Sequence, residues 1–173
     1  MLQAMYKLSS CCCSRLSPLD VPALLRLHTD REVRQFLGGP VAASVARERI
    51  ELLIAANRPL PAWAIRSAKS EHSPLLGFVA LDQHQDGKDI EVSLALLPEH
   101  QRQGIATQAV QFALRHAFGE MGLARVVAET QSLNARSIAL LERIGMVLER
   151  RVIRFGAEQR IYAALNPKRS ASP

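Results

Sequence analysis

Residues 101–107, QRQGIAT, place polar side chains and one glycine between an apolar strand-like stretch and an apolar helix-like stretch. Apolar residues from Ile105 to Ala113 recur at helical spacing, so a helix is predicted to begin at Gly104. The first N–H groups of a helix have no partner within it and carry the positive end of the helix dipole. A glycine lets a ligand approach this backbone closely. The stretch therefore predicts a phosphate-binding site, unless it is an ordinary strand-to-helix turn.

Three further residues bear on this chemistry. Pro98 lacks an N–H group and helps to end the preceding strand, which predicts a gap beside it in the sheet. Asn134 is placed to cap a later helix, and Ser137 follows one turn on, facing the same way. The glycine patterns of dinucleotide-binding folds and of P-loops are absent from the sequence. A different phosphate-bearing ligand is therefore expected.

The composition limits the class of protein. The chain has 173 residues, of which 48% are hydrophobic, and this is enough for one domain with a core. A net charge of +6 suits an anionic ligand, an acidic substrate or nucleic acid, but an aromatic content of 5% argues against base stacking. The cysteines, Cys11, Cys12 and Cys13, are adjacent, which fits neither a disulfide framework nor a zinc site. These cysteines therefore predict a reducing, cytoplasmic setting and no metal site. Because no apolar run is long enough to cross a bilayer, we also expect no membrane contact.

The periodicity of the chain predicts one α+β domain over residues 1–173, with a core at about 8–164 and a polar tail at 165–173. A strand and two helices come first, and an antiparallel meander follows, with an Asp86-Gly87 turn before its last strand. A helix, a strand, a helix and a final hairpin complete the order. The predicted strands are 6–16, 61–67, 75–82, 90–97, 124–130, 146–155 and 159–165, and the predicted helices are 17–30, a segment from 44, 104–118 and 134–144.

Two motifs, taken together, resemble a known family. Residues 101–106 read Q-x-x-G-x-A, and residues 134–146 read N-x-x-S-x-x-x-x-E-R-x-G-M. In this order they resemble motifs A and B of the GNAT superfamily of acyl-CoA N-acyltransferases, and residues 8–164 are most similar to its RimJ/RimL branch. The resemblance implies a GNAT-like single α+β domain with helices on both faces of a mixed, mostly antiparallel sheet, which is splayed between its fourth and fifth strands. It also implies transfer of an acetyl group from acetyl-CoA to a primary amine, on a protein N-terminus or a small molecule.

The resemblance also implies a role for individual residues. Glu91 matches a position where several relatives place a glutamate base, although it could equally be a carboxylate in solvent. Leu141 stands where many relatives have a tyrosine acid, which leaves Ser137 as the nearest replacement. Asn134 would reach the pantetheine arm of the cofactor, or act only as a helix cap. The other implied cofactor-binding groups are the backbones of Leu96 and Leu97, at the pantetheine arm, and of Arg102, Gln103, Gly104, Ile105, Ala106 and Thr107, at the diphosphate.

Other readings of the same residues stay open. The amine acceptor is undetermined, and the protein could be a monomer or a homodimer. A non-catalytic acyl-CoA-binding sensor is one alternative, prompted by Leu141, and a basic nucleic-acid-binding protein is another, less favoured one. His84 and His100 lie either near the acceptor entrance or simply on the surface. Four arginines of the last hairpin form either a patch for an acidic acceptor or a solvated face: Arg150, Arg151, Arg154 and Arg160.

Overall fold

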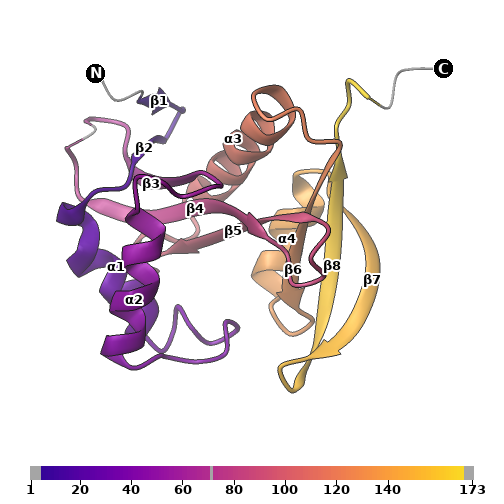
Figure 1. Cartoon of the computed structure of the whole chain (residues 1–173), viewed down its shortest axis with the longest axis horizontal. Coiled ribbons are helices and arrows are strands. Elements are labelled where there is room, and N and C mark those ends of the chain that lie inside the picture. The colour runs from indigo at the N-terminus through magenta and orange to yellow at the C-terminus, as the bar shows by residue number, and fades with distance from the viewer. Residues whose placement is uncertain (1–4, 71, 170–173) are drawn as a thin grey trace. The chain divides into compact units, whose positions relative to one another are not determined.

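The computed structural model describes residues 5–70 and 72–169, and its elements follow the predicted order (Figure 1). One difference is that the first predicted strand is divided into two. The strands are β1 (Tyr6–Lys7), β2 (Cys11–Arg15), β3 (Ala62–Ser67), β4 (Leu75–Gln83), β5 (Ile90–Leu96), β6 (Arg125–Gln131), β7 (Val147–Arg154) and β8 (Ala157–Leu165). The helices are α1 (Val21–Thr29), α2 (Ala43–Ile54), α3 (Ile105–Gly119) and α4 (Ala135–Arg143), with short 3-10 turns η1 (Pro18–Asp20) and η2 (Pro98–His100).

The strands form one mixed sheet in the order β1-β2-β3-β4-β5-β6-β8-β7. Its ladders β1–β2, β2–β3, β3–β4, β6–β8 and β7–β8 are antiparallel. The ladder between β5 and β6 is parallel and, among the described residues, has a single pair, Glu91 opposite Val127. These two are the strands between which a splay was predicted. The predicted α+β class with a mixed, mostly antiparallel sheet is confirmed.

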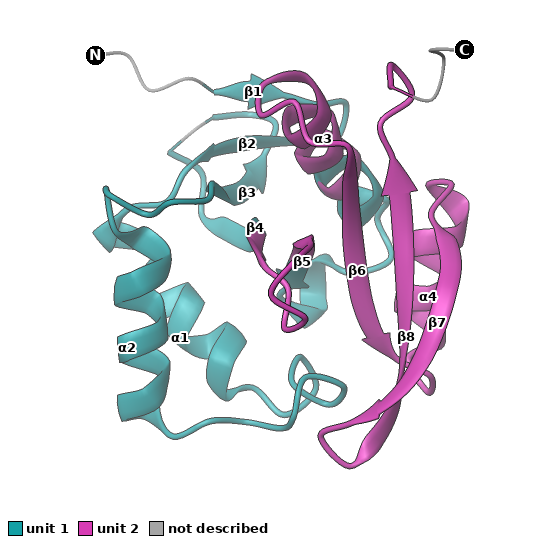
Figure 2. Ribbon diagram, turned by 45° about the vertical axis from the view of Figure 1, so that its right-hand side comes forward, with its two compact units in different colours: residues 1–80, 94–109 teal, residues 81–93, 110–173 magenta. Residues whose placement is uncertain are grey.

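The chain divides into two compact units (Figure 2). Unit 1 comprises residues 1–80 and 94–109, and in it α1 packs against α2. Gly77 of β4 is needed for a close approach, because a Cβ atom there would lie 2.2 Å from the carbonyl oxygen of Ala95 in β5. The buried core of unit 1 contains Leu16, Leu24, Leu27, Ile50, Ala64, Leu75, Ala95 and Leu97.

Unit 2 comprises residues 81–93 and 110–173, and in it α4 lies against β6, while β8 pairs with both β6 and β7. A buried cluster of Val127, Ile161 and Ala163, with Val152 packed on it, forms its sheet core. Leu165, which the predicted last strand and the predicted polar tail shared, belongs to β8, and Asn166 of the predicted tail is buried. The side-chain amide of Asn166 donates to two backbone carbonyls of unit 2. Residues 170–173 of that tail lie outside the described residues.

The helices have a length and composition suited to packing on the sheet. Over the described ranges, none of them is both long and apolar enough to span a membrane.

Candidate functional site

The predicted phosphate site is a turn with unpaired backbone donors. Arg102 and Gly104 have φ angles of 61° and 76°, both left-handed, and α3 begins directly after them. The N–H groups of Gln101 and Gln108, on either side, donate backbone hydrogen bonds. Between them, the N–H groups of residues 102–107 donate to no acceptor among the described residues. Six consecutive donors are thus available to an anion, beside the positive end of the α3 dipole.

Some backbone groups of Leu96 and Leu97, which were predicted to pair with the pantetheine arm, already form hydrogen bonds within the protein. The N–H group of Leu97 donates to the carbonyl of Leu76 at 2.9 Å, so it is not available to a ligand. The carbonyl of Leu97 accepts from the N–H group of His100 at 2.9 Å, and the carbonyl of Leu96 accepts from Nε2 of Gln101 at 3.2 Å. A carbonyl oxygen has two lone pairs, so both carbonyls keep one acceptor position. Any pairing with a ligand at Leu97 is therefore limited to its carbonyl.

Glu91 lies in β5 within unit 2, and it is not a solvent-facing carboxylate. Its side chain is half-buried, and Oε1 accepts a hydrogen bond from the N–H group of Glu129 at 3.2 Å. Burial raises the pKa of Glu91 from 4.5 to about 7, although the Glu129 N–H group and the positive charge of His84 act in the opposite direction. A carboxyl group with this pKa can accept a proton near neutral pH, as a general base must.

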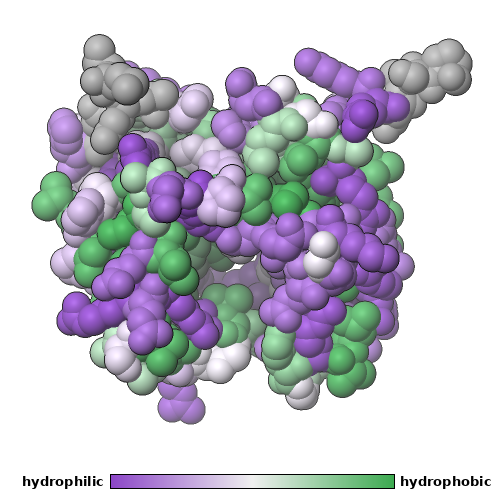
Figure 3. All heavy atoms as spheres, viewed as in Figure 1, coloured by the Kyte–Doolittle hydropathy of each residue, from purple (hydrophilic) through white to green (hydrophobic). Residues whose placement is uncertain are grey.

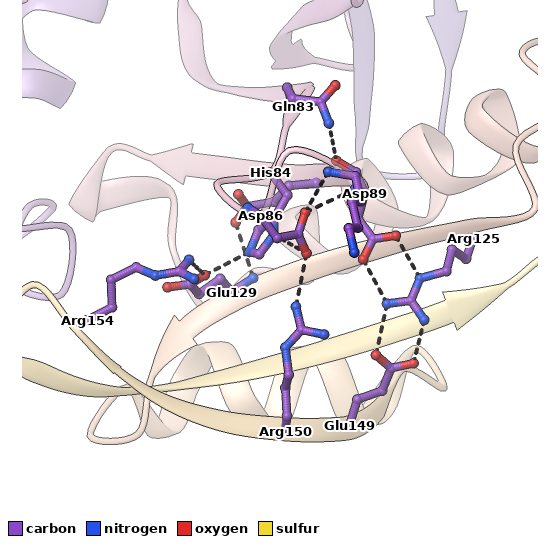
Figure 4. A network of polar contacts seen from close by, with 11 residues as sticks. Gln83, His84, Asp86, Asp89, Arg125, Glu129, Glu149, Arg150 and Arg154 are labelled. Carbon is purple, nitrogen blue, oxygen red and sulfur yellow. Dashed lines mark hydrogen bonds and ion pairs between the residues drawn. The ribbon is translucent and has the colours of Figure 1, made fainter.

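His84 is buried, with 1% of its surface exposed, so the surface alternative is wrong for this histidine. Its Nε2 lies 2.8 Å from Oε2 of Glu129, and its Nδ1 lies 2.9 Å from Oδ2 of Asp86 (Figure 4). Burial lowers the pKa of His84, but the hydrogen bonds to Glu129 and Asp86 outweigh it and raise the pKa overall. The imidazole of His84 therefore lies between two carboxylates that favour its charged form, and one of them belongs to Glu129, whose backbone N–H group binds Glu91.

Three of the four arginines of the last hairpin are ion-paired within unit 2. Arg150 lies 2.9 Å from Asp86, and Arg154 lies 2.6 Å from Glu129 (Figure 4). Arg151, on the opposite face of β7, lies 3.9 Å from Glu158. In the view of Figure 3, hydrophilic side chains lie over much of β7 and β8, and hydrophobic ones lie toward the tip of this hairpin. The fourth arginine, Arg160, donates Nε to Oγ of Ser132 at 3.2 Å. Because three of the four guanidinium groups already have carboxylate partners, the set does not form a free patch for an acidic acceptor.

The helix α4 begins as predicted. The side-chain oxygen of Asn134 accepts a hydrogen bond from the N–H group of Ser137 at 3.2 Å, so Asn134 is a helix cap. Ser137 is half-buried one turn into the helix, whereas Leu141 is 4% exposed and carries no proton to donate. A tyrosine from another element reaches the same helix, since the hydroxyl of Tyr162 in β8 donates to Oε1 of Glu142 at 3.0 Å.

Substitution of Asn134 separates its cap from a role in ligand binding. Asn134→Ala should lower the free energy of unfolding by about 1 kcal/mol, because the capping oxygen is lost. Asn134→Asp should leave stability near the wild-type value, because a carboxylate caps as well, but it removes the side-chain N–H donors. Urea unfolding measures the first effect and calorimetric titration with coenzyme A the second. Full coenzyme A affinity in both variants would leave Asn134 with the cap alone.

The predicted site residues are divided between the two units. Leu96, Leu97 and residues 102–107 belong to unit 1, while Glu91, Asn134 and Ser137 belong to unit 2. Sequence reasoning missed Glu129, whose backbone binds Glu91 and whose carboxylate binds His84. One signal was available, because Glu129 is a charged residue that directly follows the apolar run Val126–Ala128 of β6.

The fold has counterparts among solved structures. An acetyltransferase of the GNAT family from Bacillus anthracis has a TM-score of 0.79 and 21% identity, covering 94% of this chain and 99% of that chain. A spermidine N-acetyltransferase from Vibrio cholerae, in complex with CoA and spermine, has a TM-score of 0.78 and 18% identity, covering 93% and 98%. RimL, a ribosomal L7/L12 alpha-N-protein acetyltransferase, has a TM-score of 0.74 and 19% identity, covering 95% and 96%. The fold is thus that of the GNAT acetyltransferases.

The sequence matches the same class of protein. Residues 13–147 match the family described as an acetyltransferase (GNAT) domain, and the chain belongs to this family. An uncharacterized N-acetyltransferase, YnaD of Bacillus subtilis (strain 168), is 31% identical over 72 residues. That match spans 42% of this chain and 42% of the relative's length.

Proposed function

We propose that this chain transfers an acetyl group from acetyl-CoA to a primary amine by direct attack. The observation that carries the proposal is the run of six N–H groups, residues 102–107, that have no acceptor among the described residues. A diphosphate can accept several such donors at once, so the residues present fit this part of coenzyme A. The net charge of +6 favours the approach of the same anion.

The two motifs would contribute the binding groups. In motif A, the N–H groups from Arg102 to Thr107 would bind the diphosphate, and the carbonyls of Leu96 and Leu97 just before it would accept from the pantetheine amides. In motif B, Asn134 would offer its side-chain N–H donors to the pantetheine arm. Groups held in this way restrict the motion of the reactants, and this restriction supplies part of the rate.

Glu91 is the group that we assign to remove a proton from the amine. Acetyl-CoA supplies the thioester whose carbonyl carbon the amine nitrogen attacks, so that a C–N bond forms and the C–S bond breaks. The nitrogen must lose one proton in this step, and the Glu91 carboxylate would accept it directly or through a water molecule. A pKa of about 7 leaves a large ionised fraction at neutral pH, while the carboxylate remains a better base than an ordinary one.

The departing sulfur depends less on a proton donor than the amine depends on a base. Leu141 cannot donate a proton, and Ser137 is the nearest hydroxyl in the register of α4. An ordinary thiol has a pKa of about 8.5, so the sulfur can leave as a thiolate and take its proton from water. We assign Ser137 to the proton donor, and its loss should slow the reaction much less than loss of Glu91.

The acceptor is an amine in this proposal. The RimJ/RimL-like motifs favour a protein N-terminus, whereas a similar structure was solved with spermine, so we propose both an N-terminal peptide and a polyamine as test acceptors. We further propose a single catalytic domain over residues 1–173, with its core at about 8–164, acting as a monomer or homodimer. The cysteines at 11–13 are all buried, and we propose a location in the reducing cytoplasm.

The test is release of free thiol from acetyl-CoA by the purified full chain. Spermine and a peptide with a free N-terminus are the acceptors, and the same peptide with an acetylated N-terminus is the control. Thiol release with one of the free amines, and none with the blocked peptide, is the expected result.

Two other results would replace the proposal. Tight coenzyme A binding without thiol release on any amine would favour the acyl-CoA sensor. Absence of coenzyme A binding, together with RNA or DNA binding that weakens steeply with salt, would favour a nucleic-acid-binding protein.

A further inference from the structure

Within the turn that carries the unpaired donors, residues 102–104 are not held by the hydrophobic core, whereas Ile105 after them is buried. Arg102, Gln103 and Gly104 are all exposed, and two of them have left-handed φ angles. Arg102 is unusual in this respect, because residues with a side chain rarely adopt that backbone. An exposed turn in a rare conformation needs other contacts to keep its N–H groups pointing in one direction.

Those contacts converge on Glu99, at the start of the same turn. Arg26 of α1 donates Nη1 to Oε1 of Glu99 at 2.5 Å and Nη2 to Oε2 at 2.9 Å. Within the turn, Nε2 of Gln103 donates to the backbone carbonyl of Glu99 at 3.0 Å. All these residues belong to unit 1. Glu99 therefore ties the middle of the turn to the second half of α1.

The carboxylate of Glu99 has the wrong charge for a direct role in binding a diphosphate. A negative charge a few residues from the unpaired N–H groups opposes the approach of an anion. The hydrogen bond from Arg26 lowers the pKa of Glu99, and the same bond raises the pKa of Arg26, so both remain charged at neutral pH. The presence of this carboxylate is explained if Glu99 holds the conformation of the turn and does not contact the ligand.

We propose that the Arg26–Glu99 ion pair is a positioning clamp, which holds the turn at residues 102–107 in the conformation that binds the cofactor diphosphate. The identity of the ligand, coenzyme A, rests on the proposed function. The effect of the ion pair on the conformation of the turn does not depend on it. Exposed ion pairs add little to the free energy of unfolding. A bidentate arginine–carboxylate contact nevertheless fixes the relative position of its two side chains. Its value is in preorganisation, because a turn already ordered loses less entropy when a ligand binds.

The first experiment measures coenzyme A affinity by calorimetry for Glu99→Gln, Arg26→Gln and the double variant. The clamp predicts a dissociation constant about three- to tenfold higher for each single variant, and no further increase in the double variant. A purely electrostatic role predicts the opposite sign for Glu99→Gln, because a negative charge beside the diphosphate is removed. Affinity that is unchanged or tighter in Glu99→Gln would overturn the clamp.

Glu51→Gln is the matched control. Glu51 lies on the exposed face of α2 in unit 1, so this variant removes one negative charge from the same unit without touching the turn. Its coenzyme A affinity should equal that of the wild type. An increase in its dissociation constant as large as that of Glu99→Gln would assign the effect to net charge and overturn the clamp.

A second experiment needs no ligand. Amide order parameters of residues 102–107, measured by nitrogen-15 relaxation on the full chain, should be near the rigid value of about 0.85 in the wild type and in Glu51→Gln. They should fall toward 0.6 or lower in Glu99→Gln and Arg26→Gln. If no form of the protein binds coenzyme A, the proposed function fails while this measurement still decides the clamp. Equal order parameters in all variants would contradict it.

Discussion

Glu91→Gln should lower kcat for acetyl transfer by a factor of about 100 to 10,000 at pH 8, which is the range that general acid–base catalysis contributes. The glutamine is nearly the same size and can still accept the hydrogen bond from the N–H group of Glu129. It cannot take a proton from the amine. Coenzyme A affinity should be unchanged, because Glu91 is not among the groups assigned to the cofactor.

The pKa of Glu91 also predicts the direction in which the effect of Glu91→Gln changes with pH. Glu91 has a pKa of about 7, so it is protonated and inactive as a base below pH 6 and ionised above pH 8. Wild-type kcat/KM should therefore bend near pH 7, and the ratio of wild-type to variant activity should grow from pH 6 to pH 8. Glu120→Gln, at an exposed position of unit 2, is the control and should keep the bend. A bend near pH 7 in Glu91→Gln would remove Glu91 from the role of base.

The free energy of unfolding provides a second test of Glu91→Gln that does not depend on catalysis. The folded-state pKa of Glu91, about 7, lies above its ordinary value of 4.5, so ionisation favours the unfolded chain. The resulting loss of stability grows as the pH rises from 4.5 to 7 and is constant above that. Glu91→Gln lacks this loss, so it should unfold at a higher urea concentration than the wild type at pH 8 and at nearly the same concentration at pH 4.5.

Gly104→Val should raise the dissociation constant for coenzyme A by about 10- to 100-fold, equivalent to roughly 1.4 to 2.8 kcal/mol. Space is not the reason, since a Cβ atom at Gly104 would meet no other atom within 4 Å. The reason is the φ angle of 76°, which a β-branched residue strongly disfavours. The variant should relieve this strain by rotating the backbone, and the rotation turns the N–H groups of the turn away from the diphosphate.

Gly156→Val tests whether strain alone accounts for the result. Gly156 has a φ angle of 73° in the β7–β8 hairpin of unit 2, and a Cβ atom there would also meet nothing within 4 Å. Both valine variants should lose a similar amount of stability in thermal unfolding. Only Gly104→Val should lose coenzyme A affinity, and equal affinity in the two variants would count against the diphosphate assignment.

The elements that could be predicted from the sequence are those with strong local signals. The helix α3 follows from apolar residues at helical spacing, and α4 from Asn134 at its cap. The end of the chain was less well predicted, because the polar residues from Asn166 onward were interpreted as an exposed tail. The side chain of Asn166 is instead satisfied by carbonyls 43 and 48 residues away. Burial of a polar residue depends on distant partners, and these are not visible in its neighbours.

The sequence by itself determined the run of backbone donors at residues 102–107, because free N–H groups at a helix start follow from residues a few positions apart. Only the tertiary structure decided that Glu91 is half-buried with a raised pKa, that His84 is enclosed by carboxylates, and that Arg26 holds Glu99. The partners in the last two contacts, His84 with Glu129 and Arg26 with Glu99, are 45 and 73 residues apart. Such contacts depend on strand register and helix packing, which bring together charges that the chain order keeps apart.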